Sequence, residues 1–152
     1  MRRSTTYFTA TVLTLGLTAA GFAGVAAAGE QLTQKEFLKQ GNAICKTANK
    51  DISAVVDPIF AGLGRNEQPS PEQIAAIVAG AVPIYRGALS EIEALAGPAS
   101  LEKKFAKALD QYTAALDAVE ADPQAAFSRA GPDPFAKPNK TARKLGLKQC
   151  TQ

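Results

Sequence analysis

The chain contains two cysteines, and their positions constrain the fold more than any other feature of the sequence. Cys45 lies in the first helical pattern that follows an N-terminal export segment, and Cys150 lies close to the C-terminus. Exported proteins with two thiols usually join them, because the compartment outside the cytoplasm is oxidising. We therefore expect a Cys45–Cys150 disulfide that staples a small extracytoplasmic domain.

Residues 1–28 show the three parts of a secretory signal. Two arginines provide the positive start, residues 7–25 carry no charge, and Ala26-Ala27-Ala28 fits the small-residue cleavage rule. The uncharged stretch is also long enough for an uncleaved anchor, but its threonines and glycines favour cleavage. We expect a secreted mature protein, residues 29–152, that forms one domain outside the cytoplasm.

The charge balance and the missing histidine exclude several classes of function. Loss of Arg2 and Arg3 with the leader reduces the 17 basic residues to 15 against 14 acidic ones, a net charge of +1. Nucleic-acid binding needs a strongly basic face. Without histidine, Ser-His-Asp and Cys-His nucleophiles, Glu-x-x-His di-iron sites and c-type haem attachment are impossible. We expect no catalytic residues, no metal and no cofactor.

The first helix begins with clear local signals. Thr33 and Glu36 form a T-x-x-E capping box, and Leu32 and Phe37 are spaced as a hydrophobic staple. Apolar residues then recur at helical period. Pro58 is expected to end or kink this helix, because the residue before a proline avoids the helical conformation.

Two further long helices follow with the same period. The second begins at Ser70, with proline at its first position, and continues as a kinked helix across Pro83 to the stop at Gly97-Pro98. The third begins near Ser100, which we interpret as its N-cap, and ends at Asp122-Pro123.

A short helical segment is predicted from Pro123 to Ala130, and a last helix from Phe135 to Leu145 with Gly146 as its left-handed cap. No stretch alternates at the period of a strand. The sequence thus predicts an all-α fold, an antiparallel up-down bundle of three long helices plus a short C-terminal helix, stapled by one disulfide.

The chain resembles a group of small exported or lipid-anchored helical proteins of high-GC bacteria, for which no activity is established. The likeness rests on Ile44-Cys45 in the first helix and on the terminal Gly146-Leu147-Lys148-Gln149-Cys150, and it covers Gln34 to Lys50, Glu91 to Pro98 and Pro134 to Cys150. It implies a Cys45–Cys150 pair. Many members have a lipid-attachment cysteine that this chain lacks, which points to release from the membrane.

Some residues fit catalytic patterns, but each has a simpler structural explanation. Ser100 to Lys103 reads S-x-x-K, yet the partner motifs of penicillin-recognising enzymes are absent. Glu91 and Glu93 are two residues apart and do not face each other on a helix. Asp117 and Glu120 share a helix face and could hold a cation, although exposed carboxylates are the rule.

Two groups of residues are candidates for binding. Tyr85 and Tyr112 lie on apolar helix stripes and could face an aromatic ligand or ligate haem iron, although core tyrosines are commoner. A basic cluster near the C-terminus could contact an anionic lipid, a wall polymer or an acidic protein; lysines there also complement a helix dipole. Its members are Lys137, Lys140, Arg143, Lys144 and Lys148.

Two hypotheses of function follow. The first is a secreted, non-enzymatic protein that binds a protein or an envelope polymer through its surface. The alternative is a carrier of a small apolar or aromatic ligand held between kinked helices near Pro83. A cavity lined by Ile74, Val78, Tyr85 and Tyr112 would favour the carrier, whereas a filled core would favour the surface binder.

Overall fold

The computed structural model describes residues 31–64, 67–128 and 131–151, and every element within them is helical. The predicted signal segment lies outside the described residues. The all-α prediction is confirmed. The elements are α1 (Gln34–Ala61), α2 (Pro71–Glu93), α3 (Ala99–Ala121), α4 (Pro123–Phe127), α5 (Ala136–Leu145) and the terminal 3₁₀ turn η1 (Lys148–Thr151).

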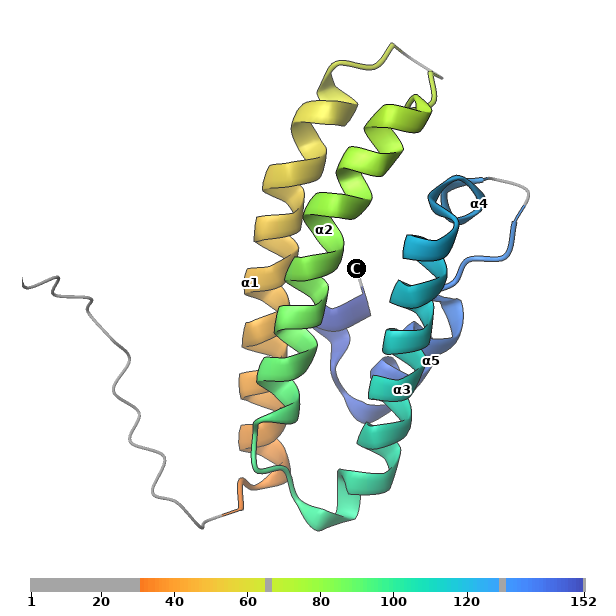
Figure 1. Cartoon of the computed structure of the whole chain (residues 1–152). Coiled ribbons are helices and arrows are strands. Elements are labelled where there is room, and N and C mark those ends of the chain that lie inside the picture. Colours follow the sequence, from red (N-terminus) through yellow and green to blue (C-terminus); the bar gives the residue numbers. More distant parts are fainter. Residues whose placement is uncertain (1–30, 65–66, 129–130, 152) are drawn as a thin grey trace, which may run out of the picture.

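Two packed pairs of helices organise the molecule (Figure 1). α1 packs against α2, and α3 packs against α5. α1, α2 and α3 run in alternating directions, and α4 covers the end of α3 next to α2 (Figure 1). α5, residues 146–147 and η1 form what we call the C-terminal arm. Because α5 packs on α3 while η1 packs on α1, this arm joins the two pairs.

The start of α1 has the predicted cap. The Glu36 backbone N–H donates to the Thr33 hydroxyl oxygen at 3.3 Å, and the Glu36 carboxylate accepts from the Thr33 backbone N–H at 3.0 Å. Leu32 packs in the same apolar cluster as Phe37, as a hydrophobic staple requires. The Leu32 N–H also donates to the Ala96 carbonyl at 2.8 Å, so the start of α1 is tied to the α2–α3 turn.

The sequence predicted that Pro58 would end or kink α1. The helix does not end there, because it continues through Pro58 to Ala61. Pro58 is exposed. A proline this close to a helix end removes one backbone hydrogen bond and leaves only one further turn to be supported. The helix stops at Gly62, which keeps a right-handed conformation.

α2 begins at the predicted Ser70 capping box and passes through Pro83 as one helix. Among the described residues it is the helix whose length and apolar composition would allow it to cross a membrane, with a mean hydropathy of 1.2 over an 18-residue window. Part of its apolar stripe is buried inside the protein. Seven residues of α2 are buried: Ile74, Ile77, Val78, Ala81, Val82, Ala88 and Ile92.

α1 and α2 pack closely at Gly80. A Cβ added at Gly80 would lie 2.5 Å from Cγ1 of Val55 on α1, closer than side chains pack. Valine is stiff at χ1 and cannot move aside easily. Because Gly80 has no side chain, the backbones of α1 and α2 can pack closely at this position.

Ser100 is not the N-cap of α3, contrary to the prediction. α3 begins at Ala99 after Pro98, and no side chain caps it. Proline has already fixed the extended entry into the helix at that point, so Ser100 falls within the first turn and is exposed. Asp122 does cap the next helix, since its carboxylate accepts from the Ala125 N–H at 2.9 Å. That helix is shorter than predicted and ends at Phe127.

α5 ends as predicted. Gly146 has φ of +93°, in the left-handed region that favours glycine. The Leu147 N–H donates to the Ala142 carbonyl at 2.9 Å, and the Gly146 N–H donates to the Arg143 carbonyl at 3.1 Å. These bonds define a Schellman motif, and its apolar contact is made by Leu147 and Ala142, which are both buried.

Candidate functional site

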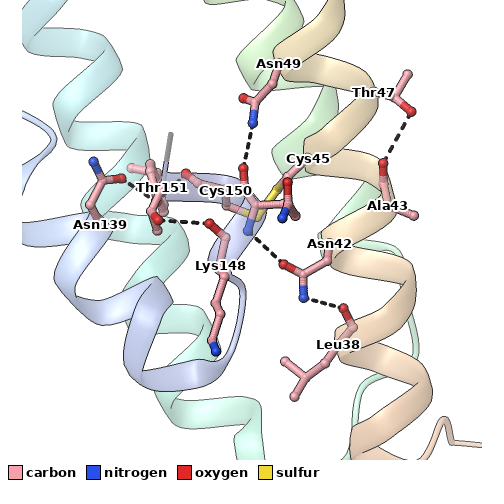
Figure 2. Close-up of a disulfide and its surroundings, with 12 residues drawn as sticks. Leu38, Asn42, Ala43, Cys45, Thr47, Asn49, Asn139, Lys148, Cys150 and Thr151 are labelled. Atoms are coloured by element: carbon pink, nitrogen blue, oxygen red, sulfur yellow. Dashed lines mark hydrogen bonds between the residues drawn. A yellow bond between two sulfur atoms is a disulfide. The ribbon is translucent and has the colours of Figure 1, made fainter.

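The structure joins Cys45 of α1 to Cys150 of η1, with the two Cα atoms 4.9 Å apart. The predicted disulfide is thus confirmed (Figure 2). Cys45 is buried among Phe37 and Ile92, and Cys150 packs on the same cluster. The bond fixes the end of the chain against the middle of α1.

Two asparagines of α1 hold the arm beside the disulfide (Figure 2). The Asn42 amide donates to the carbonyls of Leu38 at 2.7 Å and Gly146 at 3.0 Å, and its oxygen accepts from the Gln149 N–H at 2.9 Å. The Asn49 amide donates to the Gln149 carbonyl at 2.6 Å. These contacts satisfy backbone groups of the arm that no helix would pair, so the arm is anchored by more than its covalent bond.

Tyr112 belongs to this anchor. Its hydroxyl lies 2.8 Å from Oδ1 of Asn139 and 2.9 Å from the carbonyl oxygen of Cys150. The side chain is buried with Ala142 and Leu147, and this burial raises the pKa of the phenol. With Tyr85, Tyr112 also lines a small space of about 20 Å³ beside the disulfide, and its role in facing a ligand stays a prediction.

Tyr85 has different surroundings. Its ring stacks on Phe135 with centroids 5.9 Å apart and planes at 23°. Its hydroxyl has no hydrogen-bond partner among the described residues. Burial raises the pKa of this phenol too, so it is a neutral donor near pH 7.

Tyr85 lines an open pocket of about 320 Å³, which we call the Tyr85 pocket. It contains Val78 and Tyr85 from the cavity that the sequence predicted, but neither Ile74 nor Tyr112. Its walls come from four helices and the segment before α5. They are Ile52 and Val56 of α1, Ile77, Val78, Ala81, Val82 and Tyr85 of α2, Leu116 and Val119 of α3, Ala126 and Phe127 of α4, and residues 133–135.

A second open pocket, of about 400 Å³, lies at the α2–α3 turn. Phe37, Leu101 and Phe105 supply apolar walls, while Glu93 and Glu102 add carboxylates. One wall includes Gln31, where the described chain begins, and we assign this pocket no ligand.

The structure divides the predicted basic cluster. Lys137, Lys140 and Lys144 are exposed on α5, at spacings that place them on one side of a helix. Arg143 instead turns to η1, where its guanidinium donates to the hydroxyl and the carbonyl of Thr151 at 3.2 and 3.4 Å. Lys148 is exposed on η1. The cluster is thus a lysine row on α5 with two separate neighbours.

Tertiary packing adds lysines that the sequence analysis did not connect with this row. The Thr141 hydroxyl on α5 donates to the Gln111 side chain on α3 at 2.7 Å, which aligns the solvent-facing edges of the two helices. Residues three, four and seven apart share a helix face, so Lys107 and Lys104 follow Gln111 along α3, and Lys137 and Lys144 flank Thr141 on α5.

Together the two rows form what we call the α3/α5 basic face: Lys103, Lys104, Lys107, Lys137, Lys140 and Lys144. All six are exposed. Within the part of the chain that the structure describes, none of them is ion-paired. Asp110 is the acidic residue that interrupts the α3 row. The face carries a concentration of positive charge that the net charge of the mature chain conceals.

The carboxylates of Asp117 and Glu120 do hold a cation, but it is a side chain of the protein. Arg86 of α2 donates from one nitrogen to Asp117 at 2.6 Å and also to Glu120. These two hydrogen bonds raise the pKa of Arg86. The arrangement links α2 to α3. Glu91 and Glu93 are exposed.

No cluster of three or more His, Cys, Asp or Glu side chains suited to a metal occurs within residues 31–64, 67–128 and 131–151. Ser100 and Lys103, the ends of the S-x-x-K sequence, are both exposed on the first turns of α3. An acylating serine needs a buried base and an oxyanion hole beside it, and an exposed helix turn provides neither.

The chain matches no protein-family model, no curated protein and no solved structure. The resemblance to exported helical proteins of high-GC bacteria therefore stays a prediction. The class of protein is defined by the fold alone, as an all-α domain closed by a disulfide.

Proposed function

We propose that this protein is a secreted, non-enzymatic binding protein whose α3/α5 basic face contacts an anionic polymer of the cell envelope. The observation that carries the proposal is the set of six exposed lysines on one side of two packed helices, none of which is ion-paired within the described part of the chain. Like charges held on one face repel each other, and a polyanion relieves this repulsion while releasing its own counterions.

The shape of the face favours a linear polymer over a membrane surface. Lys137 and Lys144 are seven residues apart, about 10 Å along the helix, and a parallel row lies on α3. Membrane-binding helices add large apolar side chains that enter the lipid. The exposed large apolar residues of the described chain are Phe60 and Phe127, which lie on α1 and α4 and not on this face.

The fold that we propose as the scaffold for this face is an antiparallel up-down bundle of α1, α2, α3 and α5. The alternating directions of α1 to α3 support this arrangement (Figure 1). Secretion supports the proposal as well, because the predicted leader would deliver the domain to the envelope.

Charge reversal provides the test. The triple variant Lys137→Glu, Lys140→Glu, Lys144→Glu should bind soluble polyphosphate at least about tenfold more weakly than the native protein near 0.1 M salt, and the salt dependence of binding should become shallower. A matched triple variant replaces Lys39, Lys46 and Lys50, which are exposed on α1, with glutamate. It has the same net charge and should retain most of the affinity.

Equal losses in the two triple variants would mean that net charge alone attracts the polymer, and the proposal would be wrong. Binding of the native protein to phosphatidylglycerol vesicles but not to polyphosphate would assign the face to a membrane instead. Fluorescence anisotropy and vesicle sedimentation measure the two cases.

A further inference from the structure

The Tyr85 pocket is separate from the basic face and has a different chemistry. Apart from Tyr85 and Asp133, every side chain in its lining is a hydrocarbon. Its volume, about 320 Å³, lies at the lower end of the range for small-molecule sites. Such a space suits a compact ligand rather than a long acyl chain.

The polar groups of the lining restrict the ligand further. The Tyr85 hydroxyl is the one side-chain donor in the lining, and among the described residues it has no partner. Asp133 is the one charged residue, and its carboxylate accepts from the Phe135 N–H at 2.8 Å. No lysine or arginine lines the pocket, so an anionic ligand would meet a carboxylate without a compensating cation.

The aromatic residues favour a planar ligand. The Tyr85 and Phe135 rings stack on each other, and the Phe135 ring lies 6.5 Å from that of Tyr112. Phe127 adds another ring to the lining. Aromatic side chains at such distances prefer offset or edge-on partners, and a ligand ring can extend this group.

We infer that the Tyr85 pocket binds a small, neutral aromatic molecule that carries a hydrogen-bond acceptor, such as an aromatic ketone or ester. The ring occupies the apolar space between α2, α3 and α4, and the acceptor accepts a hydrogen bond from the Tyr85 hydroxyl. This inference gives the carrier hypothesis a defined site, and it does not depend on the proposed polymer binding.

A matched pair of probes tests the acceptor. Acetophenone and ethylbenzene have similar shapes, but only acetophenone carries a carbonyl. Both should cause saturable shifts of the Ala81 and Ala126 methyl resonances in NMR titrations. Tyr85→Phe should weaken acetophenone binding about fivefold, the value of one hydrogen bond, and leave ethylbenzene within about twofold. An equal change for both probes would overturn the role of the hydroxyl.

A second pair of variants tests the pocket itself. Ala126 lines the pocket and is partly buried, whereas Ala125, on the same helix, is exposed and outside the lining. Ala126→Phe should abolish the binding of both probes, and Ala125→Phe should preserve it; circular dichroism checks that both variants are folded. If Ala126→Phe fails to fold, Val56→Phe, at a partly buried position of the lining on α1, replaces it.

Two results would refute the site as a whole. The first is the absence of a saturable shift for either probe in the native protein. The second is a concentration-dependent dimer, seen by analytical ultracentrifugation, whose formation broadens the same methyl resonances, because a second copy would then occupy the pocket.

Discussion

Removal of the disulfide by Cys45→Ala with Cys150→Ala should lower stability strongly without preventing folding. The two cysteines are 105 residues apart in the sequence, so the bond closes most of the mature chain into a loop. In the chain-entropy model, a loop of this length stabilises the folded state by about 4–5 kcal/mol. The total free energy of unfolding of a small domain is about 5–15 kcal/mol, so the disulfide contributes a large share of it.

The contacts around the disulfide decide what remains after its removal. Asn42 makes two hydrogen bonds to the arm and Asn49 makes one. At about 1 kcal/mol each, these bonds contribute to the stability that remains and hold the arm on α1. Leu147 remains buried as well. We therefore expect the double variant to be folded at 25 °C, with the arm docked on α1 and the melting temperature lowered by about 10–20 °C.

Differential scanning calorimetry of the native protein, the native protein with reductant and the double variant measures the effect. Reductant should reproduce the lower melting temperature in the native protein and leave the double variant unchanged. A melting temperature that stays within about 2 °C of the native value in both cases would refute the stabilising role of the disulfide. Hydrogen exchange in α5 and η1 reports whether the arm stays docked.

Further predictions concern single positions. Gly80→Ala should destabilise by about 1–3 kcal/mol, because its Cβ would lie 2.5 Å from an α1 valine, whereas Gly87→Ala, with nothing within 4 Å, should stabilise by about 0.5–1 kcal/mol; urea denaturation compares them. Ser70→Ala should cost about 1 kcal/mol by removing a cap, and Ser100→Ala should cost almost nothing in the same assay. Burial raises the pKa of Tyr112 above its unfolded value, so the stability that its neutral form contributes is complete below about pH 10 and is lost as the pH rises further. Unfolding midpoints measured up to pH 11 should show this decline, and Tyr112→Phe should reduce it.

Local signals were sufficient to place much of the secondary structure. The capping boxes at Thr33 and Ser70 and the glycine cap at Gly146 are all found in the structure. Each depends on hydrogen bonds between residues only a few positions apart, so a short segment of the sequence contains both partners of every bond. Ser100 shows the limit of such patterns, since a serine near a helix start does not cap it when the residue before the helix is already fixed by proline.

The candidate sites depended on contacts that no local pattern contains. Tyr85 and Tyr112 have the same apolar-stripe pattern in sequence, yet one lines an open pocket and the other is hydrogen-bonded inside the core. The partner of Asp117 and Glu120 is an arginine more than 30 positions away, with sequence separations of 31 and 34. Neither outcome is encoded in the spacing of neighbouring residues.

The sequence alone predicted an all-helical domain with one disulfide. Helical period and capping residues are local signals within each segment, and two cysteines allow only one intramolecular pair. Only the tertiary structure decided which tyrosine lines the open pocket and which lysines share a face. The alignment of Lys104 and Lys107 with the α5 row depends on the packing of α3 against α5, which the Thr141–Gln111 hydrogen bond marks. Helix register of this kind results from the fit of whole side-chain surfaces between distant segments, and a one-dimensional pattern does not specify that fit.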